Sequence, residues 1–210
     1  MTTESALREY VEQYLPEDDV HLAARARGQE LGCVPIGAGG GAALRFLATA
    51  LQARAVVEIG TGAGTSGLYL LEGMPQSGIL TSIDVAPDHQ RAAREAYTSA
   101  GISPSRTRLI MGKALDVLPR LTDAAYDLVF VDAYKPEYPQ YLQHGVRMLR
   151  PGGVIAFDNV LWHGAVVDPS KRDESTQAMR DIARLVREDD RLVPVMLPLG
   201  DGLLVAARRP

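Results

Sequence analysis

The stretch VVEIGTGAGTS, residues 56–66, joins a short apolar, β-branched run to a glycine-rich loop. An apolar pattern with helical spacing follows and continues through Leu71. This order predicts a buried strand, a tight turn and a helix, the opening unit of a nucleotide-binding α/β sheet. Glycines let the backbone of the turn approach a ligand, and free N–H groups at the start of the helix can face that ligand. We therefore expect a cofactor to bind at this loop.

Two cofactors compete for such a loop. Residues 62–67 spell GAGTSG, which matches the dinucleotide fingerprint G-x-G-x-x-G. In that fingerprint the first glycine directly follows the strand, and here that residue is Gly60, which puts Thr65 at the third glycine position. Glu58, inside the strand, favours S-adenosylmethionine, because a buried acid needs a donor or a cation and this cofactor carries a cationic amino-acid group. An NAD-dependent oxidoreductase of the same fold class stays the alternative, and pairing of Glu58 with a lysine or arginine is the plainer interpretation.

Length and composition limit the number of domains and the class of protein. The chain has 210 residues, 46% hydrophobic and 23% charged, which suits one α/β domain with additional helices. A net charge of −4 offers no basic field for nucleic acid or an anionic membrane, and no apolar run approaches the ~20 residues of a membrane span. Cys33 is the single cysteine, so an internal disulfide and a cysteine zinc cluster are excluded. The first residues, MTTES, lack the apolar core of a signal peptide, and we expect a cytoplasmic protein.

From the glycine loop onward, predicted strands and helices alternate. The strands are expected at 55–59, 79–83, 107–111, 128–131 and 154–157, the helices at 87–100, 114–121, 139–149 and 174–188, and a closing hairpin at 192–197 and 203–207. This alternation predicts a Rossmann-like, doubly wound α/β fold with a mostly parallel sheet and a C-terminal antiparallel hairpin.

The N-terminal part stands outside that repeat. Helices are expected at 5–15 and 19–31, an irregular glycine-rich loop at 33–41, and a helix at 42–51. The sequence leaves three roles open for the first two helices: a lid, a dimer surface or a cover for an edge of the sheet. We expect one domain over residues 1–210, with 1–41 as N-terminal helices and loop and 42–210 as the Rossmann-like core.

Acidic and amide side chains end several predicted strands. Asp84 ends the second strand, where an acid accepts hydrogen bonds from the ribose of either cofactor, although a helix-capping role is as simple. Asp132, Asp158 and Asn159 end the fourth and fifth strands, and their oxygens suit Mg²⁺ if those strands are neighbours. Ordinary turn chemistry is the competing interpretation. His163 is best explained as a solvated loop histidine.

Lys135 lies three residues after Asp132. A lysine beside a divalent cation loses some preference for its charged form and could then accept a proton from a substrate hydroxyl. An exposed lysine at the start of a helix is the alternative.

Taken in order, the segments VEIGTG (57–62), SID (82–84), VFVDAYK (129–135), FDNVL (157–161) and LGDG (199–202) resemble the cation-dependent O-methyltransferases, the catechol and caffeoyl-CoA O-methyltransferase family. The resemblance covers nearly the whole chain. Its glycine motif occurs in many methyltransferases, whereas the set formed by Asp132, Lys135, Asp158 and Asn159 is diagnostic of this family.

The resemblance implies roles for individual residues. Asp132, Asp158 and Asn159 would bind Mg²⁺, with Mn²⁺ or Ca²⁺ also able to occupy the site, and Lys135 would be the catalytic base. The implied contacts to S-adenosylmethionine are Val34, Glu58, Gly60, Thr61, Ser66, Asp84, Val85, Ala114, Asp132 and Tyr134. The chain departs from the family pattern at Tyr134 and around 37–41, which concerns the fit of the substrate.

The implied reaction moves a methyl group from S-adenosylmethionine to a hydroxyl of a catechol-type aromatic diol, and the implied assembly is a homodimer. Two adjacent hydroxyls match two open positions on a bound cation. A catalytically silent cofactor-binding scaffold would explain neither Lys135 nor the metal set. The walls that select the acceptor lie in loops that the sequence pattern does not place.

Overall fold

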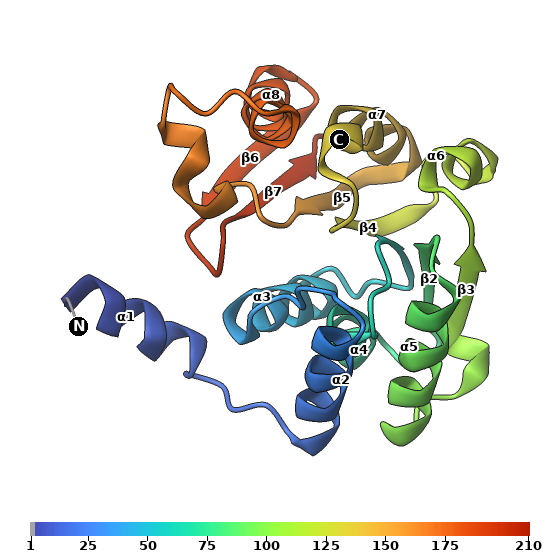
Figure 1. Cartoon of the computed structure of the whole chain (residues 1–210). Helices are drawn as coiled ribbons and strands as arrows, with labels where there is room; N and C mark the ends of the chain where they lie inside the picture. Colours follow the sequence, from blue (N-terminus) through green and yellow to red (C-terminus); the bar gives the residue numbers. More distant parts are fainter. Residues whose placement is uncertain (1–2) are drawn as a thin grey trace.

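The computed structural model describes residues 3–210 and contains one seven-stranded sheet in the order β3-β2-β1-β4-β5-β7-β6 (Figure 1). Strands β1 to β5 pair in parallel, and β7 and β6 add an antiparallel hairpin at one edge. The predicted doubly wound α/β fold is confirmed. The strands are β1 Ala55–Ile59, β2 Ile79–Asp84, β3 Thr107–Met111, β4 Tyr126–Val131, β5 Leu149–Phe157, β6 Leu192–Leu197 and β7 Leu203–Arg208.

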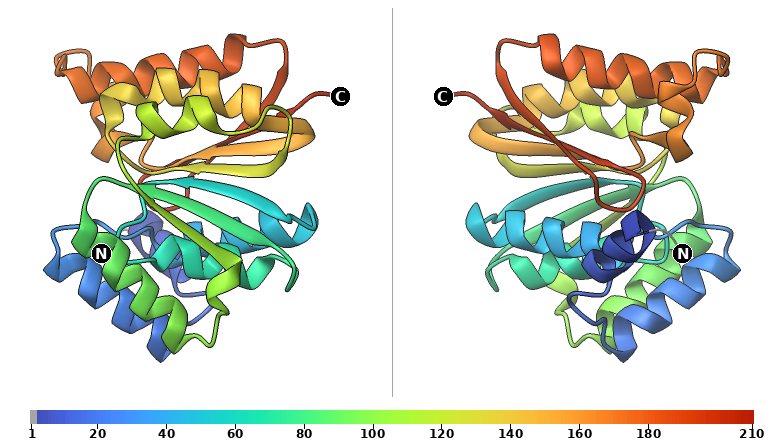
Figure 2. Two further views of the ribbon diagram at one scale, coloured as in Figure 1. Left: turned by 90° about the vertical axis from the view of Figure 1, so that its right-hand side faces the viewer. Right: turned by 90° about the vertical axis from the view of Figure 1, so that its left-hand side faces the viewer.

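Helices cover both faces of the sheet (Figure 2). One layer contains α2 Asp19–Glu30, α3 Ala38–Ala50, α4 Thr65–Gly73 and α5 Pro87–Ser99. The other contains α6 Ala114–Val117, α7 Tyr138–Met148 and α8 Glu174–Glu188. Short 3₁₀ turns are η1 Pro104–Arg106, η2 Leu118–Arg120, η3 Lys135–Glu137 and η4 Trp162–Val167. Two apolar cores result, one on each face, because a parallel sheet buries both of its faces.

The expectation of an irregular loop over 33–41 is wrong at its second half, because α3 begins at Ala38. Three glycines, 39–41, therefore lie inside the first turn of a helix. A Cβ on Gly41 would come within 2.2 Å of the Tyr69 ring, so glycine lets α3 pack closely on α4. The backbone N–H of Gly39 donates to the Glu12 carboxylate at 2.8 Å, which satisfies one of the free donors at the helix start. Close packing explains this glycine content better than flexibility does.

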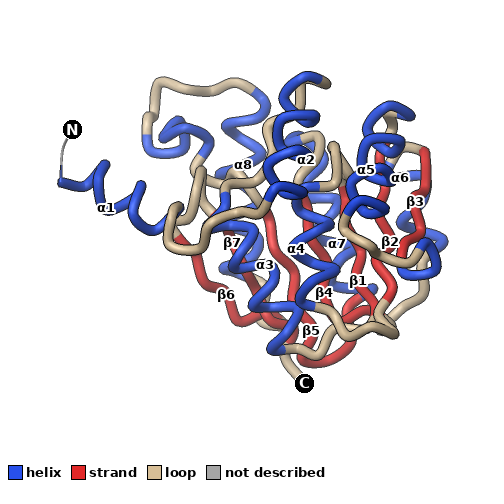
Figure 3. The backbone as a smooth tube through the Cα atoms, turned by 90° about the horizontal axis from the view of Figure 1, so that it is seen from below, coloured by secondary structure: helices blue, strands red, loops and turns tan. Residues whose placement is uncertain are grey.

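Helix α1, Thr3–Glu12, ends three residues before the predicted boundary. Glu12 accounts for this, since its carboxylate accepts from Gly39 of α3 and from the N–H of Gly200, 2.9 Å away in the β6–β7 turn. The rest of α1 extends away from the body (Figures 1 and 3). Leu7, Tyr10 and Tyr14 remain more than half exposed. These apolar side chains thus lie open in the single chain.

The carboxyl ends of β1, β4 and β5 meet at one edge, because Ile59 pairs with Val131 and Val131 pairs with Phe157. The strand order reverses between β1 and β4, and open α/β sheets bind ligands at such a switch point. Figure 3 shows α2 to α5 lying over the opposite face from α7.

Among the helices within residues 3–210, none has the length and hydrophobicity that a membrane span requires.

Candidate active site

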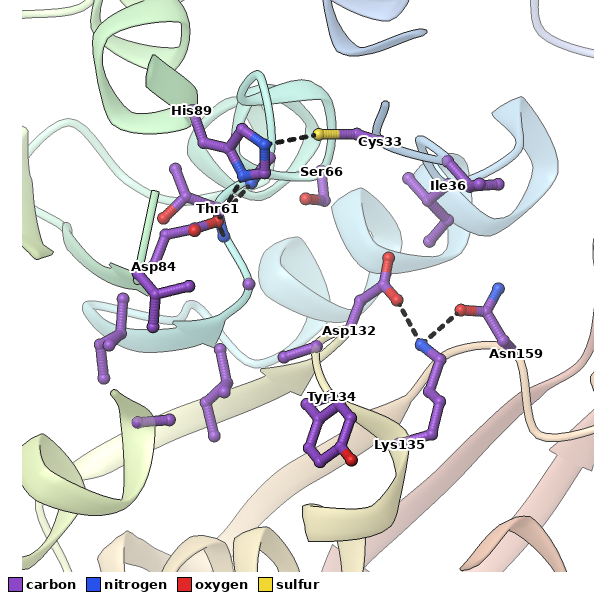
Figure 4. Close-up of a pocket in the computed structure, with 18 of the residues that line it drawn as sticks. Cys33, Ile36, Thr61, Ser66, Asp84, His89, Asp132, Tyr134, Lys135 and Asn159 are labelled. Carbon is purple, nitrogen blue, oxygen red and sulfur yellow. Dashed lines mark hydrogen bonds and ion pairs between the residues drawn. The ribbon is translucent and has the colours of Figure 1, made fainter. Parts of the chain in front are cut away.

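A cavity of about 650 Å³ opens at this switch point, between the glycine loop, the ends of β2 and β4, and the segments 33–36 and 159–163 (Figure 4). Its size is that of pockets that bind small molecules and cofactors. The predicted residues that line it are Val34, Gly60, Thr61, Ser66, Asp84, Val85, Ala114, Asp132, Tyr134, Lys135 and Asn159. The structure therefore brings most of the predicted site together in one place.

Backbone geometry explains the glycine loop. Gly60 has φ +99°, and a Cβ there would lie 1.9 Å from the carbonyl oxygen of Asp132, so only glycine fits against β4. Asp84 holds the next two residues, because its Oδ2 accepts from the N–H groups of Thr61 at 3.0 Å and Gly62 at 3.1 Å. The second-strand acid thus shapes the loop while still facing the cavity.

Glu58 is fully buried under the loop and is not one of the residues that line the cavity. Its carboxyl group accepts a hydrogen bond from the hydroxyl of Ser66 at 2.6 Å. It accepts a second from the hydroxyl of Ser82, its register partner on β2, at 2.5 Å. Burial raises the pKa of Glu58 to about 7, although the two hydroxyl donors act in the opposite direction. Glu58 therefore lies beneath the loop and is joined by one hydrogen bond to Ser66, which does line the cavity.

Lys135 lies at the centre of the predicted metal set. Its Nζ donates to Asp132 Oδ1 at 2.8 Å, Asn159 Oδ1 at 2.7 Å and the hydroxyl of Tyr138 at 2.7 Å (Figure 4). An ammonium group has three hydrogens, and all three are used here. Oxygens from the ends of β4 and β5 therefore converge on one positively charged atom, and β4 and β5 are neighbours as the metal hypothesis required.

Asp158 is the buried member of this set, at 4% exposure. Burial raises its pKa, and the negative charge of Asp132 adds to the shift. A carboxyl group in this position ionises more readily when a cation is near. Asp158 lies behind the cavity wall rather than among its lining residues, whereas Asp132 and Asn159 line it. Asn159 has φ +62°, a left-handed conformation that asparagine tolerates better than most residues.

The sequence analysis did not single out His89, which also lines the cavity. His89, in the first turn of α5, lies between Asp84 Oδ2 at 3.2 Å and the Cys33 sulfur at 3.4 Å (Figure 4). This chain of contacts ties the segment before α3 to the acid below the glycine loop. A histidine one helical turn after a strand-end acid was the available signal. His163, expected to be a solvated loop histidine, is exposed but also lines the cavity, next to Trp162.

The residues fit both implied groups. For a nucleoside cofactor, Gly60 supplies the close backbone approach and Asp84 a ribose-facing acid, while Val34, Val85 and Tyr134 give exposed apolar surface around the opening. For a hard cation, Asp132 and Asn159 present oxygen atoms that already lie at hydrogen-bonding distance from a positive charge. The donor set contains only oxygen, which suits Mg²⁺ better than zinc.

Comparison with known proteins agrees with this geometry. The O-methyltransferase family profile matches residues 13–209. A relative from Mycobacterium sp. strain JLS, named as an inferred O-methyltransferase, is 51% identical over 203 residues, covering 97% of this chain and 92% of the relative. One from Mycolicibacterium smegmatis, with a similar name, is 48% identical and covers 97% of each chain.

Solved structures give the same answer. The O-methyltransferase TomG from Streptomyces achromogenes, involved in tomaymycin synthesis and solved with S-adenosylmethionine, matches with a TM-score of 0.89, 28% identity and full coverage of both chains. A Corynebacterium glutamicum protein matches with a TM-score of 0.92, 32% identity and coverage of 100% of this chain and 98% of the other. An oxidoreductase function finds no support in these matches. Together with the glycine loop and the cavity beside it, they show that the chain belongs to the O-methyltransferase family and is an S-adenosylmethionine-dependent enzyme.

Proposed function

We propose that this O-methyltransferase depends on Mg²⁺ and methylates one of two adjacent hydroxyls on an aromatic ring. The observation that carries the proposal is the convergence of Asp132 Oδ1 and Asn159 Oδ1 on one positive charge at the edge of the cofactor cavity. Such a pair of oxygens, with Asp158 behind it, is a ready ligand set for a hard divalent cation. Mn²⁺ or Ca²⁺ would occupy the same set.

The cofactor site of the proposal uses the lining residues already described. Thr61, Ser66 and Asp84 would bind the polar parts of S-adenosylmethionine, with Val34 and Tyr134 covering its methionine end and Val85 and Ala114 its adenosine. Glu58 would act indirectly, by orienting the Ser66 hydroxyl. The bound cofactor supplies a methyl group on a positively charged sulfur. Alignment of that group with the acceptor oxygen then accounts for much of the rate.

Lys135 is the proposed proton acceptor. As described, its Nζ holds all of its protons and donates to three oxygens, so it cannot accept another. A metal ion held by Asp132, Asp158 and Asn159 would supply the positive charge that these oxygens now obtain from the ammonium group, and would polarise the acceptor hydroxyls. Lys135, relieved of those contacts, could then exist as the neutral amine and take the hydroxyl proton at Nζ.

The acceptor would enter beside Asn159, where Trp162 and Tyr134 offer aromatic surface around the cavity. These rings favour a flat aromatic acceptor over an aliphatic one. A catechol-type diol therefore satisfies both the aromatic walls and the paired positions expected at the cation.

The test is methyl transfer from S-adenosylmethionine to catechol in metal-free buffer with EDTA and after adding Mg²⁺, with cofactor binding measured beside it by calorimetry. We expect turnover to vanish in EDTA and return with Mg²⁺, while cofactor binding persists, because Thr61, Ser66 and Asp84, which would bind its polar parts, are not ligands of the proposed cation. Full turnover in EDTA would refute metal dependence. Metal-dependent turnover of a monohydroxylated acceptor as fast as of catechol would refute the diol.

We also propose a homodimer formed through α1. Leu7 and Tyr10 on this helix and Tyr14 just after it are exposed, and the groove between α1 and α3 is largely apolar, with Val11, Leu15 and Ala42 among its walls. Exposed apolar patches of this kind mark association surfaces. Sedimentation of the full chain should show a dimer that dissociates when Tyr10 and Tyr14 are both replaced by serine. A wild-type monomer at high micromolar concentration would contradict this.

A further inference from the structure

A second cluster of possible metal ligands lies outside the catalytic cavity. Within residues 3–210, Asp18, His21 and Glu72 place potential ligand atoms within 4.8 Å of one another. Asp18 and His21 are at the start of α2, and Glu72 is near the end of α4, whereas the cofactor loop precedes the start of α4. The cluster is therefore separated from the methyl-transfer site by the length of α4.

His21 is the buried member, at 4% exposure, and its ring packs on Tyr69 with a centroid separation of 4.4 Å. Its Nδ1 lies 2.8 Å from Asp18 Oδ1, which also accepts the backbone N–H of His21 at 2.9 Å. These contacts hold the pKa of Asp18 below its usual range, so the group is a carboxylate and can only accept. Nδ1 must therefore carry the proton, which leaves the lone pair of the neutral ring on Nε2.

Nε2 faces a second acceptor. It lies 3.5 Å from Glu72 Oε1 and, among the residues that the structure describes, has no hydrogen-bond partner although it is fully enclosed. The other carboxylate oxygen of Glu72 accepts from Arg45 at 3.2 Å, which leaves Oε1 turned toward His21. A nitrogen lone pair and a carboxylate oxygen at this separation repel each other unless something positive lies between them.

We propose that His21 Nε2 and Glu72 Oε1 bind a divalent transition metal of the Zn²⁺ type, with Asp18 as the acid that orients the imidazole. Two ligands about 2.0–2.1 Å from one ion and 3.5 Å from each other subtend an angle near the tetrahedral value, which zinc prefers. A carboxylate on the far nitrogen of a ligating histidine is a recurrent arrangement at zinc sites. Water would fill the remaining positions, and the exposed carboxylate of Asp18 and the partly exposed carboxylate of Glu72 give the ion a way in.

A proton is the competing occupant, because an imidazolium would bridge Asp18 and Glu72 as a simple ion pair. Among the described residues, the carboxylates nearest the ring are Asp18, the N-cap of α2, and Glu72 on α4, which also pairs with Arg45 of α3. Glu17, paired with Arg25, acts on the ring electrostatically. The separation of 3.5 Å is long for a charge-assisted hydrogen bond, which normally closes to about 2.7–2.9 Å. That gap favours an ion with two short bonds over a shared proton.

The experiment is equilibrium dialysis of the full chain against Zn²⁺ in a Cys33→Ser, Asp158→Asn background, which removes the thiol and weakens the strand-end site. We expect one equivalent of zinc in this background and none after His21→Gln or Glu72→Gln. Asp18→Asn keeps the helix cap but lowers the charge on the orienting group, and should weaken binding by about 10–100-fold. Asp19→Asn, the neighbouring acid on the exposed side, is the matched control and should bind as the parent does.

Circular dichroism and thermal melts in EDTA verify that each variant is folded. Equal zinc binding by the His21→Gln variant would overturn the proposal, as would an absence of bound zinc in a folded parent. In the latter case, ¹⁵N NMR of His21 with protons on both ring nitrogens would identify a proton as the occupant. Binding of Mg²⁺ but not Zn²⁺ would also overturn it, because a histidine ligand selects the softer ion.

Discussion

The acid under the glycine loop and the acids at the ends of β4 and β5 lie in the same sheet, yet opposite groups satisfy them. Glu58 is surrounded by neutral donors, the hydroxyls of Ser66 and Ser82. Asp132 instead meets a positive charge, the ammonium group of Lys135. Burial favours the protonated form of Glu58 against the pull of its two hydroxyl donors, whereas a cation beside a carboxylate favours the ionised form and can be exchanged for another cation.

This difference assigns a separate task to each region. Glu58 ties the loop to β2, because its carboxyl group accepts hydrogen bonds from Ser66, just after the loop, and from Ser82 on β2. In the region of Asp132, Asp158 and Asn159, by contrast, a bound cation could replace the positive charge that Lys135 now supplies. The two regions touch where Gly60 passes the carbonyl of Asp132, so the cofactor loop and the proposed metal set share one backbone contact.

The largest effect is expected from the acid cluster. Asp158→Ala should lower kcat on a catechol by about 10⁴-fold or more, since both the stabilisation by a metal and the release of Lys135 depend on that cluster. Calorimetry should show S-adenosylmethionine affinity within about twofold of wild type, because Asp158 is not among the residues that line the cofactor cavity. Asp158→Asn, which keeps the shape, serves as the folding control. A wild-type rate in a folded Asp158→Ala variant would reduce this cluster to turn chemistry.

Lys135 gives the next largest effect. Lys135→Met should lower kcat by about 10²–10⁴-fold, the usual contribution of a general base, with little change in cofactor affinity. Lys135→Arg separates charge from basicity, because a guanidinium can pair with Asp132 but cannot give up its proton at neutral pH. We expect the arginine variant to match wild type in metal-free thermal stability and to match Lys135→Met in rate. The exposed Lys171→Met variant is the control, and recovery of the rate by arginine would refute proton transfer.

Most of the fold could be predicted from periodicity and strand-end chemistry. Strands β1 and β3 and helix α8 match their predicted bounds, because each has a clear pattern with a proline, glycine or capping residue near its ends. The first turn of α3 was missed for a tertiary reason, since the need for glycine at Gly41 comes from close packing against Tyr69, which is distant in sequence. Local propensity cannot reveal a partner on another helix.

The site followed a similar division. Asp132 and Lys135 could be joined from sequence because they are three residues apart, one just after β4 and the other at the start of η3. Glu58 was assigned correctly to a buried strand, but its partner Ser82 depends on the register between β1 and β2, which the sequence does not specify. His89 was missed because its contacts, Asp84 and Cys33, come from two other segments. Contacts between residues close in sequence are predictable, whereas contacts between elements require the strand register and the packing of the helices.

The contact between the two regions can be tested directly at Gly60. Gly60→Ala should destabilise the protein by about 4 kcal/mol or more, because the added Cβ would lie 1.9 Å from the Asp132 carbonyl at a positive φ. Gly62→Ala also has positive φ, but its nearest atom is the Cys33 sulfur at 3.8 Å. That matched variant should lose only about 1–2 kcal/mol, the cost of the backbone conformation alone. Urea unfolding of both measures the difference, and equal losses would show that close packing at Gly60 does not matter.

The smallest effect is a pH dependence that belongs to Glu58. Its pKa is about 7 in the folded protein against 4.5 in the unfolded chain, so the folded state binds the proton more tightly. The resulting stability is fully present below pH 4.5 and is lost as the pH rises through 7, a change of roughly 3 kcal/mol for this buried group. Glu58→Gln has no proton to lose and should be nearly as stable as wild type at pH 5, yet more stable by up to that amount at pH 8. Urea unfolding of both proteins from pH 5 to 8 gives the difference in their free energies of unfolding. The contribution of Asp158 is common to both proteins and cancels in that difference. If the free energies of unfolding of the two proteins change in parallel with pH, Glu58 stays ionised. It would then resemble Asp132, whose carboxylate is paired with a cation.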